Sequence, residues 1–433
     1  MTDARVILWG RDIGAISWDE ERLLGIFQYA PEFVDSRIEI APLMMPLRSK
    51  PFRFAALQRE TFFGLPGLLS DSLPDKFGNA LIDAWLALQG RRPNSFNPVE
   101  RLCYIGARGM GALEFKPSLI EPITKAKRLE VESLVGLANA VLDERRELAG
   151  YLNSDDNVKE IEEIIRVGTS AGGARAKAVL AWNAETGEFR SGQVNTDEGF
   201  APWLMKFDGI TNNRDKEVAD PQGYGRIEYA YSKMAISAGI DMTECRLHFE
   251  NGRAHFMTHR FDRTKSGSKL HMQSLGALMH LDFNQAGAHS YEQAMAAILE
   301  LGLPAHDVEQ QLRRAVFNII ARNQDDHVKN IAFLMNKQGN WRLSPAFDVT
   351  YAYNPDGLWT SQHQMSINGK RDGFELEDLI ALGVLGNLKP VRVKNIVKEI
   401  MGVIEGWSNF ANEAGVAKED ALRINSTFRR LND

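Results

Sequence analysis

The sequence predicts an α+β protein in which a strand-rich part precedes a mainly helical part. Two observations support this prediction. Short apolar runs bounded by polar residues dominate up to residue 262, and apolar residues at helical spacing dominate from residue 263 onward. The 433 residues are enough for two or three structural units, each with its own core. With 44% hydrophobic and 25% charged residues, the composition is ordinary for a folded, water-soluble protein.

Charge and cysteine content exclude several classes of protein. The 51 Lys and Arg residues against 57 Asp and Glu residues give a net charge of −6, which excludes a strongly basic nucleic-acid binder as a description of the whole chain. Cys103 and Cys245 cannot build a disulfide framework or a Cys-rich zinc site, and they favour a reducing cytosol. We find no signal-peptide pattern and no apolar run near the roughly 18 residues of a membrane span. The sequence therefore predicts a cytoplasmic protein with no membrane association.

Three units are expected, namely residues 1–150, 151–262 and 263–433, with the first boundary in the polar segment Tyr151–Asn157. The first unit is expected to be strand-rich. Its predicted strands are Val6–Trp9, Ile38–Ile40, Arg101–Ile105 and Gly111–Phe115, and its predicted helices are Phe77–Leu88 and Arg128–Leu148.

The second unit is expected to follow a Gly-rich loop with strands around one helix. Its predicted strands are Ala178–Trp182, Phe189–Val194, Trp203–Phe207, Arg246–Phe249 and Ala254–Thr258, and its predicted helix is Ile227–Ala238. The third unit is expected to be helical with one strand pair. Its predicted helices are Tyr291–Leu299, Asp307–Arg322, Val391–Trp407 and Asp420–Arg429, and its predicted strands are Ile331–Met335 and Trp341–Leu343. This layout is expected for a bilobal phosphotransferase, which holds its ligand between the lobes.

The segment Asn323–Asn330 carries the most informative motif. Asp325 stands five positions before Asn330, the D-x-x-x-x-N spacing of a kinase catalytic loop. Such a loop needs a carboxylate to accept the proton of the attacking hydroxyl and an amide oxygen to bind a metal ion. The His-Arg pair that usually precedes the Asp is absent, and His327 follows it instead. A polar loop at a helix end is the alternative interpretation.

Asp348 follows a predicted strand in the segment Leu343–Val349. In kinases, an Asp at this place holds the Mg²⁺ that bridges the β- and γ-phosphates. Val349 and Thr350 occupy the positions where protein kinases usually have Phe-Gly. Asp348 is therefore a candidate metal ligand together with Asn330.

Two upstream features could bind phosphates. The small residues of Gly168–Lys177 allow backbone N–H groups to approach phosphate oxygens, although Ala174-Arg175 replaces the Lys-[Ser/Thr] of a Walker A motif, and a structural turn is an equal alternative. Lys206 ends an apolar strand, like the kinase lysine that binds the α- and β-phosphates. A surface lysine on an edge strand has the same pattern. Glu228 is either the carboxylate partner of Lys206 or an exposed glutamate in the first turn of the next helix.

The chain resembles the HipA-type toxin kinases of bacterial toxin–antitoxin pairs, because five of its segments occur in the order that is seen in those kinases. The matching segments are Ser170–Lys177, Lys206, His259–Arg263, Asp325–Asn330 and Phe347-Asp348. The resemblance covers nearly the whole chain, and the C-terminal loop is its most specific part. It implies a protein-kinase-like bilobal fold with a strand-rich N-terminal subdomain and a mainly helical C-terminal lobe.

The resemblance also implies ATP and Mg²⁺ as cofactors and assigns roles to residues. Asp325 would be the proton acceptor, and Asn330 and Asp348 would bind Mg²⁺. The implied ATP-binding residues are Gly172, Gly173, Ala174, Arg175, Lys177, Lys206, His259, Arg260, Phe261, His327, Lys329, Asn330 and Asp348. The backbone of His259–Phe261 would form the hinge that binds adenine.

Ser170 resembles the serine that these kinases phosphorylate on themselves. A phosphate adds roughly −1.5 to −2 charges and would expel the adjacent loop and block ATP. A turn-forming hydroxyl is the alternative role. Lys370 and Arg371 lie in a basic turn where relatives can contact DNA phosphates, although such turns are usually only solvated loops.

The resemblance implies a helix-turn-helix antitoxin as partner, operator DNA bound through that antitoxin, and an aminoacyl-tRNA synthetase as protein substrate. The expected function is therefore an ATP- and Mg²⁺-dependent serine/threonine protein kinase that arrests growth and co-represses its operon. Two alternatives remain open at this stage. One is a small-molecule kinase of the aminoglycoside-phosphotransferase type, and the other is a non-catalytic co-repressor that binds an antitoxin.

Overall fold

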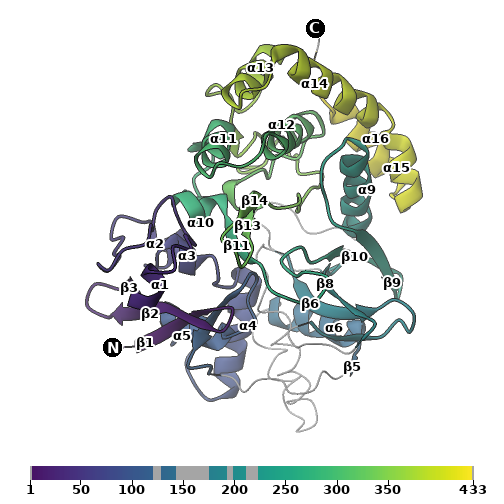
Figure 1. Ribbon diagram of the computed structural model, residues 1–433. Helices are drawn as coiled ribbons and strands as arrows, with labels where there is room; N and C mark the ends of the chain where they lie inside the picture. Colours follow the sequence, from purple (N-terminus) through teal and green to yellow (C-terminus); the bar gives the residue numbers. More distant parts are fainter. Residues whose placement is uncertain (1, 120–127, 143–174, 193–197, 211–222, 432–433) are drawn as a thin grey trace.

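The computed structural model describes residues 2–119, 128–142, 175–192, 198–210 and 223–431 (Figure 1). Strands dominate its earlier part and helices its later part, as the sequence predicts. Figure 1 shows the two larger sheets in the lower half of the view and the helices α11 to α16 in the upper half. Within the described ranges, no helix is long and apolar enough to cross a membrane.

The N-terminal unit is built on a four-stranded antiparallel sheet with strand order β3-β2-β1-β4. Apolar side chains that alternate along these strands form a core with the short helices, and Val6, Ile16 and Phe27 are fully buried in it. The elements are β1 (Thr2–Leu8), β2 (Arg11–Asp19), β3 (Leu24–Tyr29), α1 (Pro31–Val34), α2 (Arg59–Phe62), α3 (Gly67–Ser70), α4 (Lys76–Leu88), α5 (Pro98–Ile105) and β4 (Leu113–Lys116).

Two predicted strands of this unit are wrong. Ile38–Ile40 is not a strand, because Arg37 adopts a left-handed conformation with φ of +60° that breaks an extended run. Arg101–Ile105 belongs to helix α5. Asn97 and Glu100 form a reciprocal capping box at its start, and this local signal outweighs the short apolar run.

The second sheet has six antiparallel strands in the order β5-β7-β6-β8-β10-β9. Its strands are β5 (Arg128–Leu129), β6 (Lys177–Asn183), β7 (Phe189–Ser191), β8 (Phe200–Lys206), β9 (Cys245–Glu250) and β10 (Arg253–His259), and its helices are α6 (Val131–Leu142) and α9 (Tyr224–Ser237). The helix predicted over Arg128–Leu148 begins only at Val131, because Arg128 and Leu129 pair with β7. Residues 143–148 lie outside the described ranges.

One sheet face packs on α4 of the N-terminal unit and on α6. Phe77 and Leu81 of α4 share a buried core with Ala178 and Leu180 of β6 and with Met205 of β8. Side chains alternate between the two faces of a strand, so Lys177 of β6 and Lys206 of β8 point to the other face of the sheet. The first predicted unit boundary falls outside the described residues and stays a prediction.

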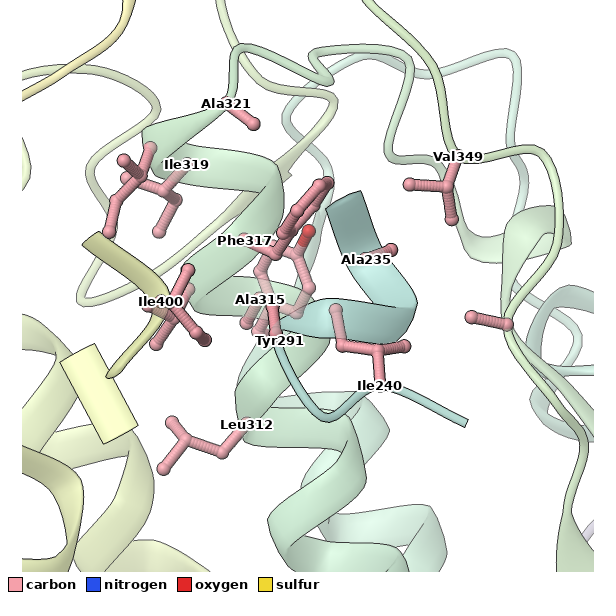
Figure 2. Close-up of a cluster of buried hydrophobic side chains, with 14 of the residues drawn as sticks. Ala235, Ile240, Tyr291, Leu312, Ala315, Phe317, Ile319, Ala321, Val349 and Ile400 are labelled. Atoms are coloured by element: carbon pink, nitrogen blue, oxygen red, sulfur yellow. The ribbon is translucent and has the colours of Figure 1, made fainter. Parts of the chain in front are cut away.

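The helical lobe packs around α12, which is buried on most sides. Figure 2 shows Leu312, Ala315 and Phe317 of this helix against Tyr291 of α11 and Ile400 of α14. Its helices are α10 (Leu275–Met279), α11 (Tyr291–Glu300), α12 (Ala305–Ile320), α13 (Leu376–Leu385), α14 (Pro390–Glu405), α15 (Trp407–Ala414) and α16 (Lys418–Thr427).

Two small sheets complete this lobe. A three-stranded sheet has the order β11-β13-β14, and β12 pairs with β15. The strands are β11 (His271–Ser274), β12 (His289–Ser290), β13 (Ala332–Met335), β14 (Trp341–Leu343) and β15 (Met365–Ser366). The catalytic-loop motif lies between α12 and β13, and Asp348 follows β14, so the two segments lie before and after the same strand pair.

Candidate active site

Lys206, at the end of β8, lies between two carboxylates from distant parts of the chain. Its Nζ donates to Glu228 Oε1 of α9 at 2.6 Å and to Asp348 Oδ1. Asp348 adopts a left-handed φ of +57°, an uncommon conformation for a residue other than glycine. The structure therefore places Lys206 and Asp348 in contact, and it gives Lys206 the buried partner Glu228.

The close approach of α9 to the sheet positions Glu228. A Cβ at Gly225 would lie 2.2 Å from the Ala254 carbonyl oxygen, so only glycine allows this packing. Gly223, with φ of +103°, starts the helix and donates its N–H to Asp208 Oδ1 at 2.8 Å. Glu228 is consequently buried, and the interpretation of this residue as an exposed glutamate is wrong.

Charge complementarity sets the protonation of this cluster. Burial raises the pKa of Asp348, but the nearby ammonium groups of Lys206 and Lys177 lower it more, so its net pKa lies well below the usual range. Burial lowers the pKa of Lys206, yet Asp348 and Glu228 raise it above its usual value. Asp348 is therefore ionised and Lys206 protonated at neutral pH.

The catalytic-loop residues form a compact turn that ends in a 3-10 helix, Val328–Asn330. Asn330 Nδ2 donates to the Asp325 carbonyl oxygen at 2.8 Å and closes the turn. The Asp325 side chain is 46% exposed, and His327 Nε2 lies 3.8 Å from its Oδ1. Asp325 therefore presents a carboxylate that a substrate can reach, on a loop closed by a hydrogen bond.

Asp326 anchors this loop, a role that the sequence analysis missed. Its carboxylate is buried and accepts hydrogen bonds from Tyr291 OH at 2.7 Å, from His363 Nδ1 at 2.7 Å and from the Gln364 N–H at 2.8 Å. Arg429 Nη1 lies 3.0 Å from His363 Nε2. Since a guanidinium only donates, Nε2 is the acceptor in this contact and Nδ1 is the donor to Asp326.

Asn330, Asp348 and His327 line one small cavity beside Phe347. Carboxylate and amide oxygens are the ligand types that Mg²⁺ prefers, and Mg²⁺ uses few protein ligands together with water and substrate phosphates. The described residues contain no cluster of three or more His, Cys, Asp or Glu side chains that could hold a metal ion without such a substrate. The donor set therefore fits a nucleotide-bound Mg²⁺.

The expected hinge residues His259–Phe261 lie at the end of β10, and Phe261 contacts the residue before Asp348. The His259 ring packs edge-on against Trp203 with the centroids 5.4 Å apart, and the Phe261 ring lies 5.4 Å from the Phe347 ring. The Arg260 side chain is buried and donates to Asp262 through Nε at 2.9 Å and through Nη2 at 2.7 Å. The backbone N–H of Arg260 donates to the Pro202 carbonyl oxygen at 2.9 Å, and that of His259 donates to the Glu244 carbonyl oxygen at 2.8 Å, so both are already used within the protein.

Three predicted cations lie around the cluster. Arg175 stacks on Tyr224, with Cζ 3.4 Å from the ring centroid, and its Nη1 is 4.0 Å from Glu228 Oε2. Lys329 Nζ lies 4.8 Å from the centroid of the Phe283 ring. Lys177 is enclosed as the first residue of β6. The predicted loop residues Gly172, Gly173 and Ala174 and the predicted phosphorylation site Ser170 lie outside the described residues.

The proposed DNA-contacting turn is tied to the protein itself. Lys370 Nζ donates to Glu375 Oε2 at 2.8 Å and to Asp378 Oδ2 at 2.9 Å, and Arg371 Nε donates to the His363 carbonyl oxygen at 2.6 Å. Each cation would have to leave or share these partners to bind a phosphate. DNA contact by this turn stays a prediction.

A bilobal α+β fold with an ionised Asp, an Asn and a buried Lys-Glu pair at one site defines the protein-kinase-like class. Comparison with family models identifies the family. Residues 169–408 match the HipA-like C-terminal domain, and residues 4–116 match the HipA N-terminal domain. The chain therefore belongs to the HipA family, which confirms the resemblance stated above.

Individual relatives agree with this assignment. A protein of Sinorhizobium fredii named as the kinase Y4mE is 26% identical over 426 residues, covering 94% of this chain and 84% of the relative. A protein of Haemophilus influenzae that is also named as a kinase is 28% identical over 135 residues, covering 28% of this chain and 39% of the relative.

A solved structure shows the same fold. It contains HipA of Shewanella oneidensis with HipB and operator DNA, and it matches with a TM-score of 0.67 at 16% identity, covering 98% of this chain and 94% of that chain. The predicted protein-kinase-like bilobal fold is confirmed.

Proposed function

We propose that the protein is an ATP- and Mg²⁺-dependent serine/threonine protein kinase that acts as the toxin of a toxin–antitoxin pair. The observation that carries this proposal is the position of Lys206 Nζ between Glu228 and Asp348. A lysine fixed in this way can hold nucleotide phosphates, and an adjacent ionised aspartate can hold the metal ion that they need. Phosphoryl transfer depends mainly on such positioning and charge neutralisation.

Each residue has a defined task in this proposal. Asp325 accepts the proton of the substrate hydroxyl, since its carboxylate is half-exposed on a loop that a hydrogen bond closes. Asn330 and Asp348 supply oxygen ligands for Mg²⁺, which when bound neutralises charge on the phosphates. Lys206 holds phosphate oxygens, and the backbone of His259–Phe261 binds adenine.

The family and its relatives support the finer parts of the proposal. The chain shares its fold with a HipA whose structure was solved with HipB and operator DNA. This likeness supports a helix-turn-helix antitoxin as the partner of the chain, and operator DNA bound through that antitoxin. The proposal has three further parts. The substrate is an aminoacyl-tRNA synthetase, autophosphorylation of Ser170 abolishes ATP binding, and the protein is cytoplasmic.

Phosphoryl transfer from γ-labelled ATP to a bacterial lysate tests the proposal. Without Mg²⁺, or after Asp325→Asn, labelling of the protein substrate should fall by about 10² or more, because general base catalysis and metal binding are both required. Asp3→Asn serves as the matched control, since Asp3 is an exposed aspartate of the N-terminal sheet. Labelling that is independent of Asp325 and Mg²⁺ would contradict the proposal.

Intact mass measurement distinguishes the remaining alternatives. After incubation with Mg-ATP, the unaltered chain should gain one phosphate that Ser170→Ala does not gain. A chain that phosphorylates only small molecules and never itself would favour an aminoglycoside-phosphotransferase type of enzyme. A chain that binds its antitoxin but transfers no phosphate would favour a non-catalytic co-repressor.

A further inference from the structure

Lys177 has a carboxylate partner that comes from the N-terminal unit. Its Nζ lies 3.1 Å from Asp75 Oδ2, and the two side chains are only 2% and 8% exposed. Lys177 pairs in register with Lys206 across β6 and β8, so both side chains point to the same face of the sheet. A residue far outside the kinase-like sheet therefore contacts a lysine directly beside the phosphate-binding lysine.

The position of Asp75 is fixed by two independent features. Asp75 is the N-cap of α4, and its Oδ1 accepts the Gly78 N–H at 2.7 Å. Helix α4 packs through Phe77 and Leu81 on the six-stranded sheet, in the core that also contains Ala178 of β6. The cap orients the carboxylate, and the shared core holds the helix against the strand that carries Lys177.

Each basic side chain of the cluster has an acidic partner only when Asp75 is counted. Arg175 lies beside Glu228, Lys206 lies between Glu228 and Asp348, and Lys177 lies beside Asp75. Burial lowers the pKa of Lys177 below its usual value, and the Asp75 carboxylate is the largest influence that opposes this lowering. Burial likewise raises the pKa of Asp75, and Lys177 opposes that rise, so each member of the pair favours the charged form of the other.

We infer that Asp75 is a positioning residue of the nucleotide site, through which the N-terminal unit keeps Lys177 charged and fixed beside Lys206 so that it can bind a phosphate oxygen. The inference rests on the proposed kinase function and deepens it. It makes the N-terminal unit a contributor to nucleotide binding in addition to any role in binding partners.

The variant Asp75→Asn isolates the charge. Asparagine has nearly the same size and is an equally good N-cap, so α4 keeps its start. We expect the affinity for Mg-ATP, measured by titration calorimetry on the full chain, to fall about tenfold at pH 7.5. Each unit by which the pKa of Lys177 falls below the assay pH lowers its charged fraction tenfold. The loss should deepen at pH 9, and it should exceed any change in affinity that the unaltered chain shows between the two pH values.

Asp83→Asn is the matched control, because Asp83 lies on the same helix and pairs with Arg101 at 2.9 Å within the N-terminal unit. This variant should lose some thermal stability without a pH-dependent change in Mg-ATP affinity. Equal Mg-ATP affinities of Asp75→Asn and the unaltered chain at pH 7.5 and 9 would overturn the inference, as would equal losses in both variants. Absence of Mg-ATP binding by the unaltered chain would instead contradict the proposed function itself.

Discussion

The charge of Lys206 is fixed by the two carboxylates on either side of its ammonium group. Glu228 is buried and gains no stabilisation from water, so it depends on Lys206 as much as Lys206 depends on it. Asp348 is shared between Lys206 and the cavity that Asn330 and His327 line. The Asp348 carboxylate can therefore hold Lys206 in the free protein and face a metal ion in the complex with nucleotide.

Lys206→Met should lower kcat/KM for ATP by about 10²–10³, the range found when one preorganised electrostatic contact to a reacting group is removed. Steady-state kinetics with labelled ATP measures this change. Lys337→Met is the control, since Lys337 is an exposed lysine in the turn after β13. Unchanged kinetics of Lys206→Met would contradict the role of Lys206 in holding phosphates.

At the scale of elements, the catalytic loop separates two adjacent aspartates by function. The side chain of Asp325 is half-exposed, whereas that of Asp326 is buried with three donors directed at its two oxygens. Burial raises the pKa of Asp326, but His363 and the other donors lower it more, so its net pKa is below the usual value. Asp326 therefore holds the loop as an ionised carboxylate.

Asp326→Asn should lower the free energy of unfolding by about 1–3 kcal/mol, because either orientation of the amide directs an NH₂ group at a donor. Asp325→Asn should leave the unfolding midpoint unchanged while it abolishes activity. Thermal unfolding followed by circular dichroism compares the two variants. Equal midpoints for both variants would show that Asp326 does not anchor the loop.

Elements with strong local signals could be predicted from the sequence. Lys177–Asn183, Tyr291–Glu300 and Trp341–Leu343 agree closely with their predictions. The strand predicted over Arg101–Ile105 is wrong, because the Asn-Pro-x-Glu capping signal before it starts helix α5. That signal is present in the sequence and outweighs the short apolar run.

The candidate site could be predicted only in part. Asp325 and Asn330 lie within one short motif, so their spacing alone predicts their proximity. The contacts of Lys206 with Glu228 and Asp348 depend on three distant segments. The sequence predicts Glu228 only as one of two alternatives, and no local signal places Asp348 beside Lys206. Asp75 was missed, because an aspartate at a helix N-cap is common and nothing local indicates a lysine from another unit.

At the scale of the whole molecule, buried polar contacts join the N-terminal unit to the rest. His271 of β11 is fully buried, and its Nε2 contacts the Ile40 carbonyl oxygen at 2.9 Å. Asp262 is also fully buried, and it accepts hydrogen bonds from Arg260, from Arg263 and from the Gly111 N–H. These contacts explain why the N-terminal unit can contribute to the site.

Acid should weaken the molecule through His271, because burial lowers its pKa to about 4. The unfolded chain, with a histidine pKa near about 6.5, binds more protons than the folded chain between these two values. The free energy of unfolding therefore falls as the pH falls from about 6.5 to 4. Thermal unfolding across this range measures the decrease.

His271→Gln keeps a hydrogen-bond donor but does not titrate, so its unfolding midpoint should depend less on pH in this range. An identical pH dependence of the unfolding midpoint in the variant and the unaltered chain would exclude His271 as a contributor.

A crystal structure with Mg²⁺ and a non-hydrolysable ATP analogue tests the central claim most directly. We expect the metal ion about 2.0–2.1 Å from oxygens of Asn330 and Asp348, with Lys206 on the phosphates and Asp325 facing the γ-phosphate. A nucleotide bound elsewhere, or bound with these four side chains away from its phosphates, would contradict the account.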